Sequence, residues 1–400
     1  MTGQGMGGNA SLSTVSTIFF VLALGTFTLG TAEFAAMSLV PMIARGFGIS
    51  EPQAGHIIVA YAAGVSVGAP LFALFGARFS RKHLLVGMML FYALGNALSA
   101  LCSGADWLLV CRFVTGLPHG AYFGVAGLVA SCLVPPERRS RAVSRVILGL
   151  TIATIAGVPA ADIIGQTLGW RWTFAVIALL SLITAGLVGW FAPRDRPRMG
   201  ASIGNELRAL RMVQVWLTLG VGVIGFGGIF CVYTYLASIM DHVTHVPAGY
   251  VPPMFALFGL GMTAGTLVCG WLADRWMMPT MGGVLIVGAV AMAFFPMAAH
   301  AFLPLAIVVF MIGASGGLST VVQSRLLEVA DGAEGLVAAF NQSAFNTANA
   351  IGPYLGGLAI SAGAGWTSVG WVGLVLTLGG GVFFLISLLV QTRQAGSSQS

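Results

Sequence analysis

Apolar stretches long enough to cross a membrane follow one another along nearly the whole chain, with short polar connections between them. A helix needs about 20 predominantly apolar residues to cross the hydrocarbon core of a bilayer, which is roughly 30 Å thick. We predict membrane-spanning helices at residues 15–40, 53–75, 83–102, 107–133, 143–166, 172–192, 213–239, 250–273, 280–299, 302–324, 334–360 and 367–390. The pattern therefore indicates an all-α membrane protein with twelve transmembrane helices.

The two halves of the chain repeat a glycine pattern. Gly64-x-x-x-Gly68 recurs as Gly261-x-x-x-Gly265, 197 residues later. Small residues at this spacing let helices approach closely in a membrane. A tandem repeat of this kind is typical of secondary transporters, which hold a midplane site between two bundles. We predict a six-helix bundle at 1–192, a cytoplasmic linker at 193–212, a second six-helix bundle at 213–390 and a cytoplasmic tail at 391–400.

Composition excludes a soluble domain, because 57% of the residues are hydrophobic and only 8% are charged, whereas a soluble protein carries about 25% charge. If the N-terminus is cytoplasmic, all of the 18 Lys and Arg residues except Arg45, Arg112 and Arg171 fall on the cytoplasmic side. The positive-inside rule then predicts a multi-pass inner-membrane protein with both termini in the cytoplasm. This distribution accounts for the net charge of +6, so we expect no nucleic-acid partner.

Few ionisable residues lie at membrane depth, and each costs roughly 2.5–3.5 kcal/mol at a helix centre. Glu33, Arg112 and Asp162 are predicted at similar depth in the first half. One hypothesis is that Glu33 or Asp162 exchanges a proton, with Arg112 as a movable counter-charge. The alternative is a permanent ion pair that only orients the helices. His119, after Pro118, is a candidate to relay protons or to bond the substrate, and the alternative is that it bonds a carbonyl that the proline frees.

The predicted span at 334–360 carries a polar stripe. Gln342, Asn346 and Asn349 step by four and three residues, which places three amides on one helical face. A neutral hydrogen-bonding stripe suits a polar, uncharged solute, so these residues are candidates for substrate binding. Hydrogen bonding between helices is the alternative.

Two histidines near the end of the predicted span at 213–239 have the residue type of metal ligands. His242-x-x-His245 has no third ligand in sight, and two ligands are a weak metal signal. We therefore expect a solvated loop, with no metal and no other cofactor.

Several motifs resemble those of the major facilitator superfamily. Gly270–Arg275 is similar to the G-x-L-A-D-R signature of that family, and the counterpart at 73–82 has Ala77 where the pattern has Asp. Arg112–Gly116 resembles the family's span-four signature, which is associated with proton coupling. Glu33 matches the acidic position of the span-one motif.

The chain looks most like the twelve-span drug:proton antiporters of this family, in the arabinose-efflux-permease-like group. Gly157-Val158-Pro159 and Gly352-Pro353 resemble the antiporter motif, whose glycines and proline shape a hinge. The resemblance implies the fold of that family, two six-helix bundles around one site. It also implies gating roles for Arg78, Arg81, Asp274 and Arg275 at the cytoplasmic ends, and for Gly157, Pro159, Gly352 and Pro353 at the hinges.

The function predicted from these features is proton-coupled efflux of a small polar or amphipathic solute, such as a sugar, a nucleoside or a drug, by a monomer in the lipid bilayer. A proton-coupled importer or a uniporter is an alternative of the same class. An enzyme is not expected, although Gly313-Ala314-Ser315-Gly316 matches the G-x-S-G string of intramembrane serine proteases.

Overall fold

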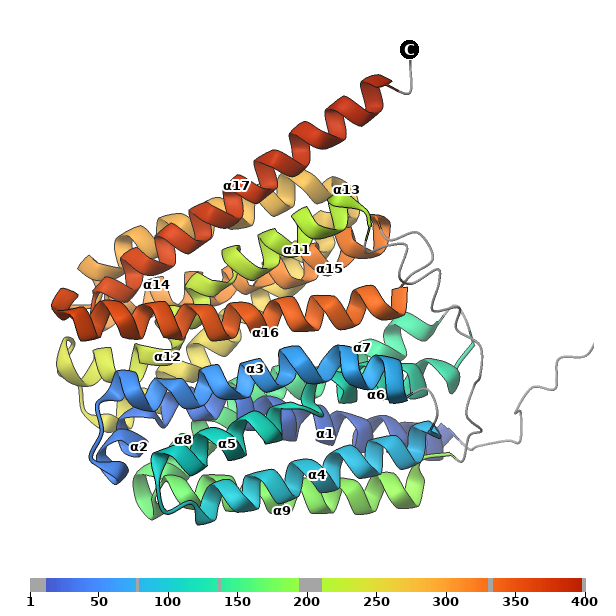
Figure 1. Ribbon diagram of the computed structural model, residues 1–400, viewed down its shortest axis with the longest axis horizontal. Coiled ribbons are helices and arrows are strands. Elements are labelled where there is room, and N and C mark those ends of the chain that lie inside the picture. Colours follow the sequence, from blue (N-terminus) through green and yellow to red (C-terminus); the bar gives the residue numbers. More distant parts are fainter. Residues whose placement is uncertain (1–11, 77–78, 136–137, 194–210, 330–333, 398–400) are drawn as a thin grey trace, which may run out of the picture.

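The computed structural model describes residues 12–76, 79–135, 138–193, 211–329 and 334–397, and every regular element in these residues is a helix (Figure 1). The α-helices are α1 (Leu12–Ser38), α2 (Val40–Phe47), α3 (Glu51–Phe75), α4 (Arg81–Leu101), α5 (Ala105–Gly116), α6 (His119–Cys132), α7 (Arg139–Ile152), α8 (Val158–Leu168), α9 (Trp170–Phe191), α11 (Val213–Gly225), α12 (Gly227–His242), α13 (Val251–Ala298), α14 (Phe302–Ala314), α15 (Leu318–Val329), α16 (Glu334–Ala359) and α17 (Ser368–Ser397). Short π- and 3₁₀-helical segments are η3 (Ala153–Gly157), η4 (Ala248–Tyr250), η5 (Ser315–Gly317) and η6 (Ile360–Ala364).

Among the described residues, ten helices are long and apolar enough to cross a membrane. Nine of them each match one predicted span. The tenth, Ala248–Ala298, covers the predicted spans at 250–273 and 280–299, and its backbone leaves helical geometry at Trp276. α16 coincides with the predicted span at 334–360 but is not one of these ten. The all-helical membrane fold is confirmed, whereas the count of twelve spans stays a prediction.

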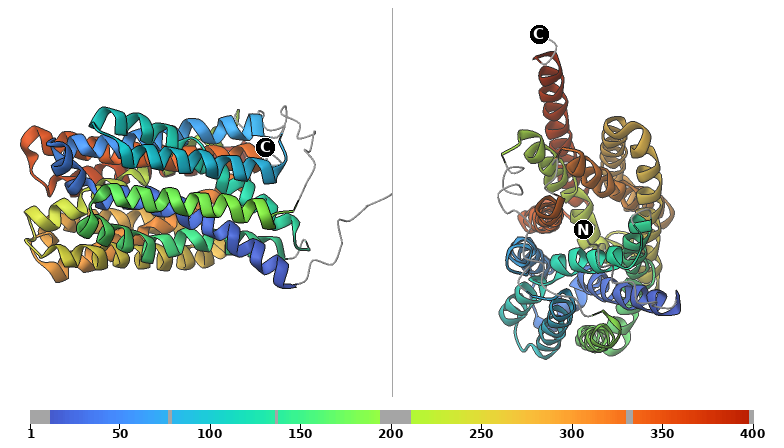
Figure 2. Two further views of the ribbon diagram at one scale, coloured as in Figure 1. Left: turned by 90° about the horizontal axis from the view of Figure 1, so that it is seen from below. Right: turned by 90° about the vertical axis from the view of Figure 1, so that its right-hand side faces the viewer.

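The helices of the two sequence halves lie in two groups, one above the other (Figure 1; right-hand view of Figure 2). α3 of the first half packs along α16 of the second at the seam between the groups. One hydrophobic cluster draws only on residues 18–192, and a second draws on both halves. The seam is therefore part of the core and not a loose contact.

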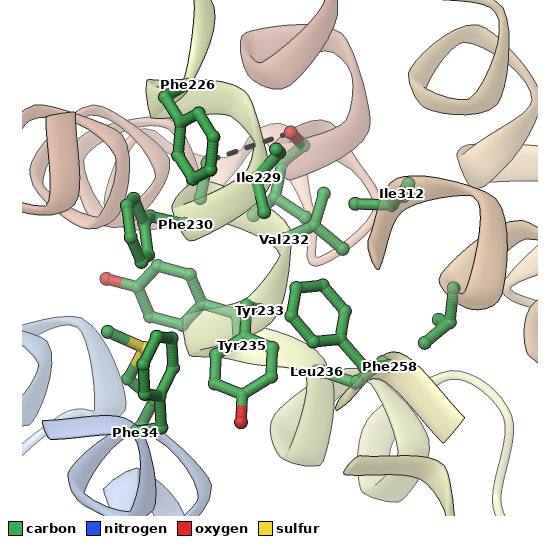
Figure 3. Packing of buried hydrophobic residues seen from close by; sticks show 14 of the residues in the cluster. Phe34, Phe226, Ile229, Phe230, Val232, Tyr233, Tyr235, Leu236, Phe258 and Ile312 are labelled. Atoms are coloured by element: carbon green, nitrogen blue, oxygen red, sulfur yellow. Dashed lines mark hydrogen bonds between the residues drawn. The ribbon is translucent and has the colours of Figure 1, made fainter. Parts of the chain in front are cut away.

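Aromatic side chains join α1 to α12 across this seam (Figure 3). The ring of Phe34 stacks on Phe230 with centroids 6.3 Å apart and meets Tyr233 edge-on at 5.6 Å. Aromatic pairs add roughly 0.5–1.5 kcal/mol beyond the burial of their area. Because Phe34 directly follows Glu33, this packing also holds the acidic residue at the seam.

The repeated glycines perform the same packing role in both halves. A Cβ atom on Gly64 in α3 would collide with the carbonyl oxygen of Phe113 in α5. A Cβ atom on Gly261 in α13 would likewise collide with the carbonyl oxygen of Phe310 in α14. Only glycine permits such close backbone contact, so the sequence repeat corresponds to a repeated helix pair.

Four of the predicted spans contain breaks that the hydrophobic pattern did not predict. Leu117–Pro118 separates α5 from α6, η3 lies between α7 and α8, Phe226 separates α11 from α12, and η5 lies between α14 and α15. At Pro118 the missing backbone N–H and the crowding of the preceding turn interrupt the helix. The π-helical segment η3 and the 3₁₀ segment η5 are local changes of helix geometry that are common at functional sites. The breaks leave apolar character unchanged, so a hydropathy pattern cannot reveal them.

Candidate functional site

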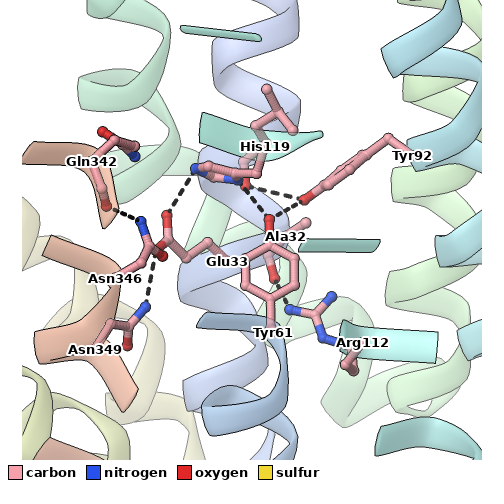
Figure 4. A network of polar contacts seen from close by, with 10 residues as sticks. Ala32, Glu33, Tyr61, Tyr92, Arg112, His119, Gln342, Asn346 and Asn349 are labelled. Atoms are coloured by element: carbon pink, nitrogen blue, oxygen red, sulfur yellow. Dashed lines mark hydrogen bonds and ion pairs between the residues drawn. The ribbon is translucent and has the colours of Figure 1, made fainter. Parts of the chain in front are cut away.

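A single buried carboxylate contacts both halves of the protein. Glu33 lies in α1 with 3% of its surface exposed. Its Oε1 accepts a hydrogen bond of 2.9 Å from Nδ2 of Asn349 in α16, and its Oε2 lies 3.4 Å from Nε2 of His119 in α6 (Figure 4). A buried acid is costly without such partners. The seam thus provides polar groups from each half for one ionisable group.

His119 continues the network into the first half. Its Nδ1 lies 2.6 Å from the hydroxyl of Tyr61 in α3, and that hydroxyl lies 2.7 Å from the hydroxyl of Tyr92 in α4. Both tyrosines and the histidine are buried. Glu33, His119, Tyr61 and Tyr92 therefore form a continuous chain of polar contacts across four helices. An imidazole can accept at one nitrogen while donating at the other, so the arrangement is suited to proton relay.

Arg112 lies beside this chain without pairing directly with the acid. Its Nη2 donates to the carbonyl oxygen of Ala32 at 3.2 Å, next to Glu33 in the chain. The centre of its guanidinium lies 4.1 Å from the centroid of the Tyr61 ring and 5.3 Å from that of Phe174. Such cation–π contacts are strong when desolvated, and Arg112 is fully buried. The arginine is thus held by α1 and two aromatic rings.

The predicted amide stripe on α16 divides into different environments. Asn349 reaches Glu33, whereas Nδ2 of Asn346 donates to the backbone carbonyl of Gln342 at 3.1 Å. Asn346 and Asn349 are fully buried, and Gln342 is partly exposed. All three lie on the side of α16 that faces His119 and Glu33 (Figure 4). The spacing argument correctly placed them together, but it did not indicate that one of them binds the acid.

Asp162 takes part in a different set of contacts. Its Oδ2 accepts a hydrogen bond of 2.7 Å from Nε2 of Gln166 in the same helix. The same nitrogen of Gln166 lies 3.1 Å from the carbonyl oxygen of Ala248 in the second half. The two buried acids therefore have separate partners, each set with a link across the seam.

The predicted hinge glycines lie at close contacts between helices. A Cβ atom on Gly157 would collide with the hydroxyl of Thr31 in α1, and one on Gly352 would collide with the carbonyl oxygen of Gly227 at the start of α12. Pro159 follows the π-helical turn η3, and Pro353 lies inside α16. Each motif thus combines a close helix contact with a proline, in equivalent places of the two halves.

Two of the predicted cytoplasmic gate residues, Arg81 and Arg275, have contacts within their own halves. Arg78 lies outside the described residues. Nη1 of Arg81 lies 3.2 Å from the sulfur of Cys132, at the far end of α6. Asp274 is exposed, and the exposed Arg275 places its guanidinium 4.1 Å from the Trp271 ring centroid, just before the bend at Trp276.

The sequence analysis did not single out Tyr61 and Tyr92. A hydroxyl at membrane depth needs a partner when buried, so tyrosines inside predicted spans are a usable signal. Ser66 and Ser343 were also missed, although their hydroxyls donate to each other's backbone carbonyls at 3.2 and 2.9 Å. These bonds join α3 to α16 beside the site.

Comparisons with known proteins agree with this architecture. A model of the Major Facilitator Superfamily matches residues 22–330. The inner membrane transport protein YdhP of Escherichia coli (strain K12) is 38% identical over 356 residues, which cover 89% of this chain and 92% of that protein. The chloramphenicol resistance protein of Streptomyces lividans is 33% identical over 342 residues, which cover 84% of this chain and 86% of that protein.

A solved structure shares the fold. The crystal structure of a bacterial homolog to the human lysosomal transporter Spinster superposes with a TM-score of 0.68 at 16% identity, covering 94% of this chain and 96% of that one. The family consists of membrane transporters for small molecules and not of enzymes, which excludes the intramembrane protease alternative. The family match, the relatives and the multi-pass helical fold together show that this chain belongs to the Major Facilitator Superfamily.

Proposed function

We propose that this transporter is a proton-coupled exporter of the inner membrane, which moves a small polar or amphipathic solute outward by alternating access. The observation that carries the proposal is the position of Glu33, between Asn349 of one half and His119 of the other. A proton bound or released there changes a contact between the two halves. That is the minimum requirement for coupling proton movement to a change of conformation.

The coupling follows from the chemistry of a carboxyl group. An ionised Glu33 accepts a hydrogen bond at Oε1 from Asn349, and a bond from an amide to a charged acceptor contributes about 1.5–3 kcal/mol. Protonation removes the charge and turns one oxygen into a donor, which weakens the bond from Asn349. The halves then separate more easily at the seam. Proton binding thus favours one conformation over another, as linkage requires.

The proposed path of the proton passes through His119. With its proton on Nε2, the neutral imidazole offers an N–H to Glu33 and accepts at Nδ1 from Tyr61. Transfer at one nitrogen and release at the other is chemistry that histidine performs well. Arg112 is the proposed counter-charge, because movement of α1 would bring its guanidinium from the Ala32 carbonyl toward Glu33. Asp162 is the proposed second proton site, linked to the other half through Gln166.

The solute site is proposed to lie at the seam, along the amide stripe of α16. Gln342, Asn346 and Asn349 carry neutral donors and acceptors, and Phe34 and Tyr233 carry apolar ring faces. Both sets lie at the seam, where separation of the halves would expose them to a solute. Together they suit an uncharged solute with a polar and an aromatic part. The name of the Streptomyces lividans relative, a chloramphenicol resistance protein, supports a drug of this kind.

We also propose the full topology of twelve spans with both termini in the cytoplasm. α13 would cross the membrane twice, turning at Trp276, and α16 would form a further span. The gate at the cytoplasmic end would then contain Arg78, Arg81, Asp274 and Arg275, with hinges at Gly157–Pro159 and Gly352–Pro353. Fusion of a green fluorescent protein to the C-terminus should give fluorescent cells, since this reporter fluoresces only in the cytoplasm. An active alkaline phosphatase fusion at that position would contradict the topology.

The decisive experiment is solute-dependent proton release in everted membrane vesicles. The vesicle interior is acidified by respiration, and chloramphenicol, arabinose, uridine or tetraphenylphosphonium is added outside. An exporter should carry the solute into the lumen and release protons from it, which an acridine dye reports. Glu33→Gln should abolish the proton release while the protein stays folded.

The alternatives give different results in the same vesicles. A uniporter would move solute without any proton signal. An importer would show proton-coupled solute uptake in right-side-out vesicles. In everted vesicles it would not accumulate solute against the solute gradient. Either result would overturn the proposal of proton-coupled export.

A further inference from the structure

Outside the central site, the two halves also meet at the end of the bundle where α1 ends and α3 begins, here called the distal end. Nε2 of His242, at the end of α12, lies 3.1 Å from Oε1 of Glu51, at the start of α3. The residues are 191 positions apart and belong to different halves. His242 therefore ends a helix and does not lie in a loop, and its side chain, 41% exposed as expected of a solvated residue, contacts the opposite half.

A tryptophan covers one face of the His242 ring. The imidazole of His242 stacks on Trp366 with ring centroids 4.7 Å apart and an angle of 12° between the planes. Trp366 follows Gly365, whose φ of +82° is in the left-handed region that favours glycine. The glycine lets the chain turn after η6 and brings the indole over His242.

Glu51 is held in place by the start of its own helix. Ser50 caps α3: its hydroxyl accepts from the backbone N–H of Gln53, and the side chain of Gln53 accepts from the N–H of Ser50. Such a box defines the first turn of a helix, and Glu51 is the first residue of that turn. Its second oxygen, Oε2, is buried and has no hydrogen-bond partner among the described residues. The carboxylate is thus presented to His242 from a fixed position.

The contact borders a cavity of about 460 Å³ lined by both halves, with Arg45, Glu51 and Pro52 on one side and Ile360, Ser361 and Trp366 on the other. Two other polar neighbours, Arg45 and His245, have contacts with backbone carbonyls of their own segments. Nε of Arg45 donates to the carbonyl of Pro41 in its own helix, and Nδ1 of His245 lies 3.0 Å from the carbonyl of Asp241. Glu51 and His242 are therefore the pair that crosses this part of the seam.

We infer that Glu51, His242 and Trp366 form a latch that holds the two halves together at the distal end. When the latch is closed, the cavity beside it is bounded by both halves and the pathway is shut at that end. Its opening is a step that alternating access by a transporter of this family requires. The latch does not depend on proton coupling at Glu33, on the direction of transport or on the identity of the solute.

Hydrogen–deuterium exchange of the full-length protein in lipid nanodiscs tests the latch without any solute or proton gradient. The variants are Glu51→Ala, His242→Ala and the double variant, with His245→Ala as the matched control because its ring lies at hydrogen-bond distance from the Asp241 carbonyl in its own half. Glu51→Ala should speed hydrogen exchange of residues 360–368, and His242→Ala that of residues 44–54, each roughly twofold to fivefold, since opening free energy controls exchange and an exposed pair contributes little to it. The double variant should equal the single ones.

The outcomes separate a latch from a local disturbance. Faster exchange confined to the mutated half, or the same change in His245→Ala, would overturn the proposal. Additive effects in the double variant would do so as well, because partners in one contact are not additive. If His242→Ala fails to fold, His242→Asn keeps the helix end polar and gives the same test. Coupled transport at the wild-type rate in Glu33→Gln would overturn the proposed coupling but leave these exchange results unchanged, so the two proposals fail independently.

Discussion

Within the part of the chain that the structure describes, two contacts join a glutamate to a histidine, and their surroundings differ. At the centre, Glu33 and His119 lie 3.4 Å apart with 3% and 1% of their side chains exposed. At the distal end, Glu51 and His242 lie 3.1 Å apart with 15% and 41% exposed. Water screens charges at the exposed pair, so it is worth little. A change of charge at the buried pair has a large effect on free energy, so the central pair is suited to coupling proton binding to a conformational change. The weaker distal pair is suited to reversible closure.

The largest effect is expected from Glu33→Gln, which breaks the central contact with the least change of shape. The amide cannot release or bind a proton at physiological pH, so solute-dependent proton release should fall at least roughly 100-fold, equivalent to about 2.7 kcal/mol. Proton release in everted vesicles measures this. Solute exchange without a gradient should persist, and coupled transport at the wild-type rate would remove Glu33 from the mechanism.

The bond across the seam is tested by Asn349→Ala. This change removes the amide donor to Glu33, a loss of about 1.5–3 kcal/mol for a bond to a charged group, so coupled transport should fall roughly 10- to 100-fold. The matched control is Ser181→Ala, since the buried Ser181 hydroxyl donates to the Ile177 carbonyl in its own helix and not across the seam. Equal effects of the two variants would mean that Asn349 matters only for helix packing.

A smaller effect is expected from Arg112→Lys. Lysine keeps the charge but loses the planar group that faces Tyr61 and reaches Ala32. We expect coupled transport to fall about tenfold, the equivalent of 1.4 kcal/mol. Arg145→Lys is the control, because Arg145 is an exposed arginine over the ring of Phe19. A permanent structural arginine would instead lower thermal stability without changing the coupling ratio.

The smallest effect is expected from the distal pair, and it should depend on salt. Glu51→Ala should change the rate of solute transport by no more than about threefold, since exposed pairs contribute roughly 0–1 kcal/mol. At 1 M salt, where charges are screened beyond about 3 Å, the variant and the wild type should converge. The effect of Asn349→Ala should be the same at both salt concentrations. A salt-independent effect of Glu51→Ala would mean that the distal contact is not electrostatic.

The two contacts also show which parts of the fold and of the site could be predicted from the sequence. The apolar pattern predicted the helices, and the spacing of Gln342, Asn346 and Asn349 placed three amides on one face. The apolar pattern and the residue spacing did not predict the side-chain contacts from His119 through Tyr61 to Tyr92, since these residues lie on three different helices. Periodicity gives the direction of side chains around one helix, but it contains no information on which helices become neighbours.

The sequence by itself determined that this protein lies in a membrane and that its two halves repeat the same helix pair. Apolar stretches of this length place the chain in a bilayer, and inside a bilayer the backbone N–H and C=O groups must be bonded within helices. Gly64 and Gly261 specify the same close helix pair in each half. Only the tertiary structure decided which polar groups meet. Glu33 with Asn349, and Glu51 with His242, are separated by 316 and 191 residues. Their partners depend on the packing of the two halves against each other, which is a property of the whole seam and not of any one segment.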